Sequence, residues 1–202
     1  MFFQDTRSIG LVFWIVVGLQ LFTGVTMLLA IFMDGLVILP DEVLDHDMYC
    51  ITMGVGSLVT AAMYGYNAHK VMSRSMSRIK VLRDYVVTVG LCTLLGGIFN
   101  GGAMYLFTSE PLLGIMMTMG TIVTGIIVTI VGMIIDNGKR GILKKIIWAI
   151  LVIAFALMFV FSLLEAGSYL EFADNVAHLL LSFFMLALIT DSEVRKEMGA
   201  KS

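Results

Sequence analysis

From Leu112 to Ile135 the chain reads LLGIMMTMGTIVTGIIVTIVGMII, without one charged side chain. A bilayer core about 30 Å thick needs roughly 20 apolar residues in an α-helix, so this stretch is long enough to cross it. Five other stretches have similar length and character, which predicts an all-α integral membrane protein with one polytopic domain over residues 1–202, folded as a six-helix bundle. The expected spans are approximately 8–33, 49–67, 84–107, 112–135, 146–164 and 172–190.

The thirteen lysines and arginines all fall in segments that alternating spans place on one side of the membrane. Cytoplasmic loops carry the excess of Lys and Arg, so this pattern predicts that both termini are cytoplasmic and that the protein lies in the cell membrane. Most acidic residues fall in the opposite loops. The basic residues are Arg7, Lys70, Arg74, Arg78, Lys80, Arg83, Lys139, Arg140, Lys144, Lys145, Arg195, Lys196 and Lys201.

Composition agrees with a bundle embedded in lipid. Hydrophobic residues make up 59% of the chain and charged residues 14%, so a water-soluble fold of this size could not bury its apolar surface. Nothing in the sequence suggests nucleic-acid binding, and it contains no glycine-rich phosphate loop. The sequence does not identify a cofactor.

Small residues predict how two of the helices pack. Helices in lipid associate through close packing of Gly, Ser and Thr, because lipid leaves little hydrophobic drive between them. The third span contains a Gly-x-x-x-Gly step from Gly97 to Gly101, and the fourth carries a seam of small residues on one face. We therefore expect a tight antiparallel hairpin across the short connection 108–111. The seam consists of Gly114, Thr118, Thr121, Gly125 and Gly132.

Polar side chains form a stripe on one face of the sixth span. Its members follow one another at helical spacings of three, four and four residues. Polar groups are costly inside a membrane and often mark function. The similar depth of polar residues on other spans predicts an outward-facing pocket between the third, fourth and sixth spans. The stripe is Glu171, Asp174, His178 and Ser182, and the residues expected to join it are Asn100, Thr118 and Gln20.

Three interpretations of this stripe remain open. It could be a hydrogen-bonded structural seam between helices. It could instead bind a solute or a divalent metal, with Asp174 and His178 as ligands, because carboxylate and imidazole at this spacing offer two donors. In a hydrolytic interpretation, Ser182 would be the nucleophile, His178 the base and Asp174 the group that orients the base.

Two families offer comparisons. The run DNVAHL at Asp174–Leu179 resembles the last transmembrane helix of rhomboid intramembrane proteases, which implies a role for His178 as the catalytic base. The Gly-x-Ser-Gly nucleophile motif of that family is absent, and the corresponding stretch 117–125 contains no serine. In size and topology, the chain is also similar to the substrate-capturing subunits of energy-coupling-factor vitamin transporters. That similarity implies that the outer loop 34–48 covers an outward pocket.

The segment Lys70–Arg83 alternates basic and apolar residues. It could form an amphipathic helix that lies on anionic lipid or docks a partner subunit, or its charge could simply reflect the positive-inside bias. Taken together, the sequence predicts a small membrane transport component that binds a cationic or polar solute. The alternatives are a non-catalytic subunit or scaffold of a larger complex and, third, a rhomboid-like or other intramembrane hydrolase.

Overall fold

The computed structural model describes residues 6–33, 35–39, 41–73, 76–136, 141–164 and 169–200, without the side chains of 169–172 and 174. Seven helices lie within these ranges, and none of these residues forms a β-strand. The helices are α1 (Arg7–Leu29), α2 (His46–Ser73), α3 (Arg78–Phe107), α4 (Pro111–Ile135), α5 (Ile142–Leu164), α6 (Tyr169–Ile189) and α7 (Ser192–Glu197).

Each predicted span is a helix, and α1 to α5 are long and apolar enough to cross a membrane. The bounds differ most for α2, which begins at His46 rather than Tyr49 and continues to Ser73 rather than Asn67. α3 begins at Arg78 rather than Asp84. Both helices extend beyond the apolar stretch because good helix formers, such as Ala68 and Lys70 in α2 and Arg78 and Lys80 in α3, continue them. In α6 the apolar part is shorter, Asn175–Ile189.

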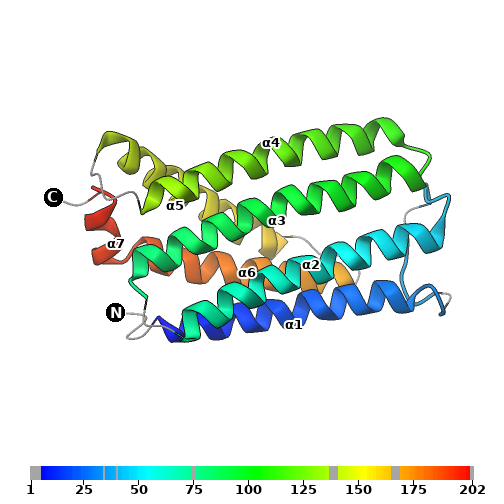
Figure 1. Ribbon diagram of the computed structural model, residues 1–202, viewed down its shortest axis with the longest axis horizontal. Helices are drawn as coiled ribbons and strands as arrows, with labels where there is room; N and C mark the ends of the chain where they lie inside the picture. The colour runs from blue at the N-terminus through cyan, green and yellow to red at the C-terminus, as the bar shows by residue number, and fades with distance from the viewer. Residues whose placement is uncertain are drawn as a thin grey trace.

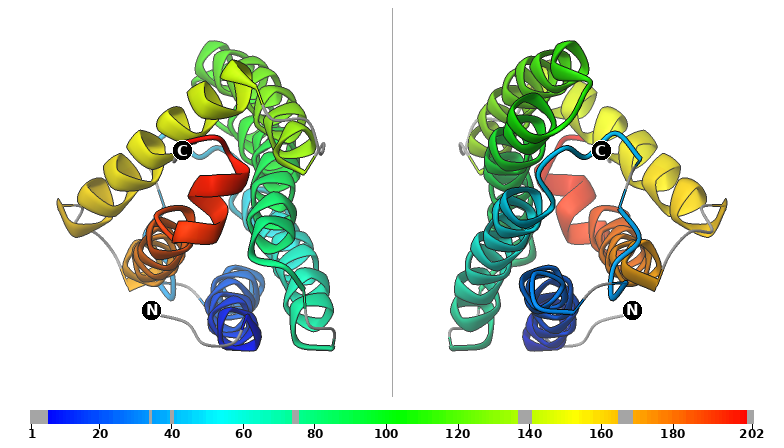
Figure 2. Two further views of the ribbon diagram at one scale, coloured as in Figure 1. Left: turned by 90° about the vertical axis from the view of Figure 1, so that its left-hand side faces the viewer. Right: turned by 90° about the vertical axis from the view of Figure 1, so that its right-hand side faces the viewer.

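The helices form two layers. Figure 2 shows α1 to α4 side by side in chain order, with α5 and α6 forming a second layer that meets the first at α1 and near α4. α6 therefore packs between α5 and α1, and α4 packs mainly on α3. The start of α1 and the end of α7 lie at the same end of the bundle (Figure 1).

Aromatic rings form the centre of the core. Phe13 of α1 stacks on Tyr85 of α3, with ring centroids 5.8 Å apart and planes inclined by 11°. The ring of Phe155 of α5 also lies against that of Tyr85, with ring centroids 5.8 Å apart. All three side chains are buried, so they link three helices from both layers. Such aromatic pairs add roughly 0.5–1.5 kcal/mol beyond the area that they bury.

The predicted hairpin of α3 and α4 is confirmed. A β-carbon added at Gly101 would fall against Thr118, and its counterpart at Gly97 would fall against Thr121. The Thr118 hydroxyl donates to the Gly114 carbonyl at 2.8 Å, so its polar group is satisfied within its own helix. Glycine in one helix and threonine in the other thus allow the two backbones to approach closely.

α7 is a short helix that the sequence did not predict. The Asp191 side chain caps it by accepting a hydrogen bond from the Glu193 amide at 3.0 Å. Val194 and Met198 are fully buried in the core. α7 thus anchors the C-terminal segment to one end of the bundle.

Candidate functional site

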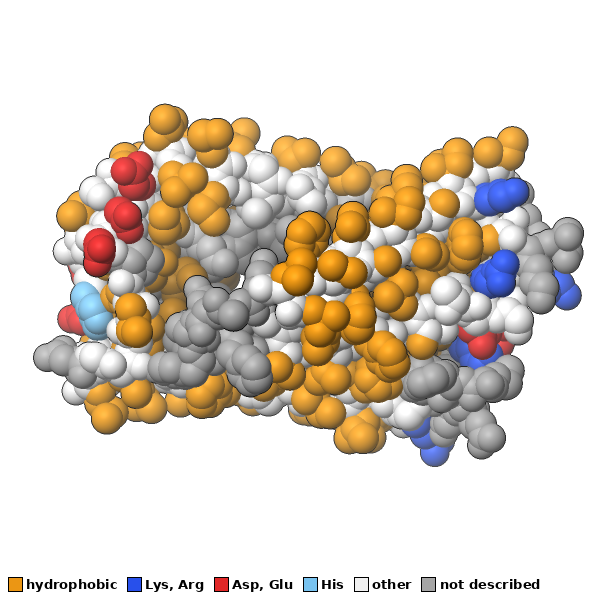
Figure 3. All heavy atoms as spheres, turned by 180° about the vertical axis from the view of Figure 1, so that it is seen from behind, with side chains coloured by type: hydrophobic (Ala, Val, Ile, Leu, Met, Phe, Trp, Pro, Cys, Tyr) orange, Lys and Arg blue, Asp and Glu red, His pale blue; other side chains and the backbone are white. Residues whose placement is uncertain are grey.

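The described basic side chains gather at one end of the bundle, where they outnumber the acidic ones, and the other end is acidic. The end that carries α7, here called the basic end, holds the described lysines and arginines (Figure 3). The opposite end, here called the acidic end, holds Asp41, Glu42, Asp45, Asp47 and Glu110. The basic residues are Arg7, Lys70, Arg78, Lys80, Arg83, Lys144, Lys145, Arg195 and Lys196.

The polar face of α6 points partly into the bundle. Ser182 is fully buried, and its hydroxyl donates to the Leu179 carbonyl at 3.0 Å. His178, one helical turn before it, is half-buried and has an interaction partner. The side chains of Glu171 and Asp174 lie outside the described part of the structure, so the predicted Asp174–His178 metal pair is not described there.

The other predicted site residues lie on three different helices. Gln20 of α1 is half-buried and has an interaction partner. Since α6 packs against α1, the structure brings the helix of Gln20 next to the helix of His178 and Ser182. Thr118 is instead half-buried in the seam between α3 and α4, and Asn100 of α3 is exposed. α6 thus packs mainly against α5 and α1, with a smaller contact to α3.

The loop between α1 and α2 is joined to the corner between α3 and α4. The Leu44 amide donates to the Phe107 carbonyl at 2.7 Å, and the Ser109 amide donates to the Glu42 carbonyl at 2.9 Å. These bonds hold the second half of the loop beside α3 and α4. His46 lies 3.5 Å from the Asp47 carboxylate, but no group of three potential metal ligands occurs among the residues that were described.

An ion-pair network connects three helices at the basic end. The Lys70 ammonium of α2 lies 2.5 Å from Asp84 Oδ2, and the Arg83 guanidinium lies 2.5 Å from Asp84 Oδ1. Arg83 also reaches Asp136 at the end of α4, at 3.0 Å. Asp84 is buried, so each of its carboxylate oxygens has a cationic partner where water is scarce.

The helix bounds and the burial of its apolar residues change the interpretation of the segment Lys70–Arg83. The segment is not one amphipathic helix, because α2 ends at Ser73 and α3 begins at Arg78. Its apolar residues Val71, Val81 and Leu82 are fully buried in the core of the chain itself. These side chains are thus not available to anionic lipid or to a partner subunit.

Sequence reasoning missed a cavity between α2 and α3 near the basic end, here called the α2–α3 cavity. Its volume is about 450 Å³, and its lining includes Asn67, Lys70 and Asp84 together with apolar side chains. Asn67 and Lys70 are three residues apart and so share one face of α2. That spacing, with Asp84 at the start of the predicted third span, was the available signal.

Asn67 stands out among the residues that line this cavity. Its side chain is 2% exposed, and neither the amide oxygen nor the amide nitrogen has a hydrogen-bond partner among the described residues. Leaving a buried polar group unsatisfied costs about 1–3 kcal/mol.

Comparison of the chain with protein-family models, with curated proteins and with solved structures finds no match.

Proposed function

We propose that this protein crosses the cell membrane six times, has both termini in the cytoplasm, and serves as a small transport component for a polar or cationic solute. The separation of charge between the two ends supports the orientation, since cytoplasmic loops carry the excess of Lys and Arg. The return of the chain to the basic end supports an even number of crossings.

The proposal makes α6 the sixth span. α6 has 21 residues, and at about 1.5 Å per residue this length is close to the roughly 30 Å of a bilayer core. Its apolar part, Asn175–Ile189, begins after the polar first turns. Those turns would lie towards the headgroups, at the acidic end.

The burial of Ser182 on the polar face of α6 is the observation that carries the transport role. Polar side chains within a span are costly, and they tend to mark solute or ion pathways when they face the bundle interior. We propose that Asp174, His178 and Ser182 bind the solute, with Gln20 of the neighbouring α1 below them. The acidic end would raise the local concentration of cations. Asn100 is exposed on α3, and Thr118 lies in the contact between α3 and α4. Both residues therefore have a lesser part in this proposal.

The orientation can be tested by cysteine labelling. The two native cysteines are free and buried, so a background of Cys50→Ser and Cys92→Ala removes their contribution. We expect Glu42→Cys to react with a membrane-impermeant maleimide in intact cells. Lys196→Cys should react only after the cells are permeabilised. Labelling of Lys196→Cys in intact cells would contradict the proposed orientation.

The transport role can be tested by ligand stabilisation of the purified protein. Heating with a panel of divalent cations and small amines should reveal a solute that raises the melting temperature, because a ligand at 100 times its Kd stabilises by about 2.7 kcal/mol. His178→Ala and Ser182→Ala should abolish the shift. Ser162→Ala is the matched control, because the Ser162 hydroxyl on α5 makes a similar bond to the Met158 carbonyl at 2.8 Å. A shift that survives His178→Ala would contradict the site.

A second candidate is a membrane subunit of a larger assembly. Within an apolar 18-residue stretch of each helix, 17% is buried in α4 and in α5, compared with 33% in α1, α2 and α3. Their outer faces are apolar and would contact either lipid or another membrane protein. A subunit role predicts a larger defined assembly in mild detergent that Ile153→Trp, on the exposed face of α5, disrupts. The monomeric mass under these conditions would favour the transport role instead.

A further inference from the structure

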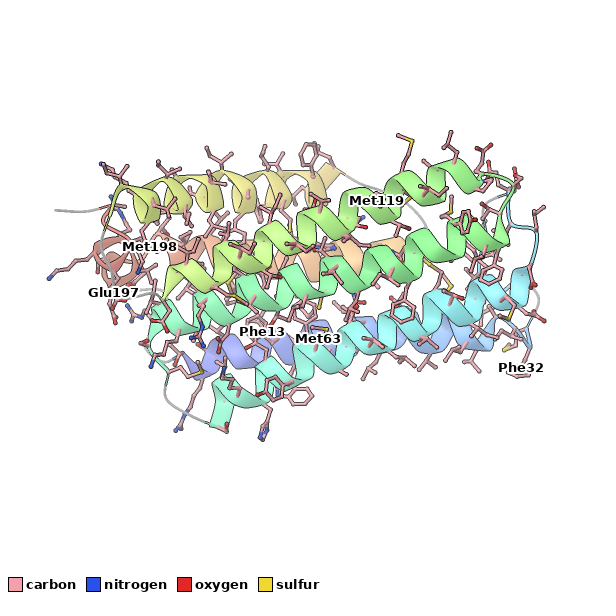
Figure 4. All side chains as sticks on the ribbon, turned by 45° about the horizontal axis from the view of Figure 1, so that its top comes forward. Phe13, Phe32, Met63, Met119, Glu197 and Met198 are labelled. Carbon is pink, nitrogen blue, oxygen red and sulfur yellow. The ribbon has the colours of Figure 1, made fainter. Side chains whose placement is uncertain are left out.

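The α2–α3 cavity is polar towards one end and apolar towards the other. Asn67, Lys70 and Asp84 line the part nearest the basic end. Val59, Met63 and Leu91 line the part that lies deeper along the helices. Figure 4 shows Met63 on the side of α2 that faces α3, where its sulfur lies 3.9 Å from that of Cys92. A volume of about 450 Å³ lies within the usual range for sites that bind small molecules.

Asn67, which lines the polar end of the cavity, carries an unused donor and acceptor. The Asn67 amide can donate through Nδ2 and accept through Oδ1, and both atoms are buried and unsatisfied within the described part of the chain. A hydroxyl group matches this amide, because it can accept one hydrogen bond and donate another. Thr88, which also lines the cavity, is half-buried and adds a second hydroxyl nearby.

The charges around this end already balance one another. Lys70 and Arg83 contribute two positive charges, and Asp84 and Asp136 contribute two negative charges, in the pairs described above. A charged ligand group would have to break one of these pairs and leave a partner uncompensated. An uncharged group leaves the network intact.

The shape of the cavity matches the layers of a bilayer. Its polar end lies close to the ends of the helices, and Tyr66 at its rim is exposed, as tyrosines at a membrane interface often are. Leu91 is also partly exposed, so the apolar part opens sideways on the outer face of α2 and α3. If a lipid enters this cavity from the bilayer, its apolar chain would lie in the apolar part and its headgroup in the polar part.

We propose that the α2–α3 cavity binds a single-chain lipid with an uncharged, hydroxyl-bearing headgroup, of the monoacylglycerol type. A glycerol hydroxyl bonds to the Asn67 amide, and the acyl chain lies along Val59, Met63 and Leu91. This site lies on a different pair of helices from the proposed solute site on α6, so either proposal can fail alone.

The test uses the full-length protein in dodecyl maltoside, titrated with 1-monoolein and measured by native mass spectrometry. We expect one monoolein per chain, bound at least about tenfold more weakly by Asn67→Leu, which removes the two hydrogen bonds. Leu91→Trp fills the apolar part and should weaken binding to a similar extent. Leu106→Trp, an exposed leucine on the same helix outside the cavity, is the matched control and should bind like the natural protein.

Two headgroup controls complete the experiment. Oleate and lysophosphatidylcholine carry a single acyl chain with a charged or zwitterionic headgroup, and we expect each to bind about tenfold more weakly than monoolein. Equal monoolein binding by all four proteins would overturn the site. Tighter binding of oleate or lysophosphatidylcholine than of monoolein would overturn the uncharged headgroup.

Discussion

Arg78, at the start of α3, forms an ion pair with Asp191, the residue that caps α7. Arg78 Nη1 lies 2.7 Å from Asp191 Oδ2, and the two side chains are only 13% and 16% exposed. Asp191 thus has two roles, because it also accepts the hydrogen bond that begins α7. This pair fixes the C-terminal segment against the first layer of helices at the basic end.

We predict that Asp191→Asn lowers the free energy of unfolding by about 2 kcal/mol. Asparagine can still cap α7, but it removes the negative charge 2.7 Å from Arg78, and breaking a fully buried pair costs about 3–5 kcal/mol. The remaining solvent contact reduces that cost. Glu193→Gln is the control, because Glu193 is 52% exposed and lies 3.7 Å from Arg78, so we expect a change below about 0.5 kcal/mol. Denaturant unfolding in micelles measures both, and equal effects would argue against the role of the pair.

Two adjacent glycines of α3 should respond in opposite ways to alanine. At Gly101 a β-carbon would lie 2.8 Å from the Thr118 backbone nitrogen, so Gly101→Ala forces α3 and α4 apart and should cost about 1–3 kcal/mol. At Gly102 it would meet nothing within 4 Å. Gly102→Ala should therefore stabilise the helix by about 0.5–1 kcal/mol. Thermal unfolding of the two variants side by side provides the measurement, and a stable Gly101→Ala protein would show that the two helices are not in close contact.

Trp148 of α5 makes a polar contact that holds the end of α6. Its indole Nε1 donates to the Ile189 carbonyl at 2.9 Å, and the Arg195 guanidinium lies 5.8 Å from the centre of its ring. Trp148→Phe keeps an aromatic face for Arg195 but removes the donor, so it should lower the free energy of unfolding by about 1 kcal/mol. Trp14→Phe, at an exposed tryptophan on α1, should change it by less than about 0.5 kcal/mol. The prediction fails if chemical unfolding does not separate the two variants.

The helices and one helix pair could be predicted from the sequence for physical reasons that are local to each segment. The composition of an apolar run such as Leu112–Ile135 is enough to predict that it forms a helix in lipid. The seam from Gly114 to Gly132 decides which face of α4 can approach another helix, and the short connection 108–111 makes α3 the partner. These inferences require no knowledge of the rest of the bundle.

The helices that pack against α6 could not be predicted, because no single segment of the sequence shows which helices meet. Depth along the helices placed His178 level with Asn100 and Thr118, but depth does not say which helices meet. In the structure α6 packs mainly against α5 and α1 and makes a smaller contact with α3, so the helix of Gln20 is one of its main neighbours. The pairing of Arg78 with Asp191 and the α2–α3 cavity likewise arise from contacts between segments far apart in the chain.

Asn67 provides a last prediction, on stability in the absence of lipid. In protein stripped of lipid, Asn67→Leu should raise the free energy of unfolding by about 1 kcal/mol, because it replaces an unsatisfied buried amide with an apolar group of similar size. Thr60→Val on the same helix is the control. The Thr60 hydroxyl already donates to the Gly56 carbonyl at 3.1 Å, so its removal should bring no gain. Added monoolein should raise the melting temperature of the natural protein and not that of Asn67→Leu, since the lipid supplies the partner that the amide lacks. A loss of stability in lipid-free Asn67→Leu would mean that the amide is satisfied within the folded protein.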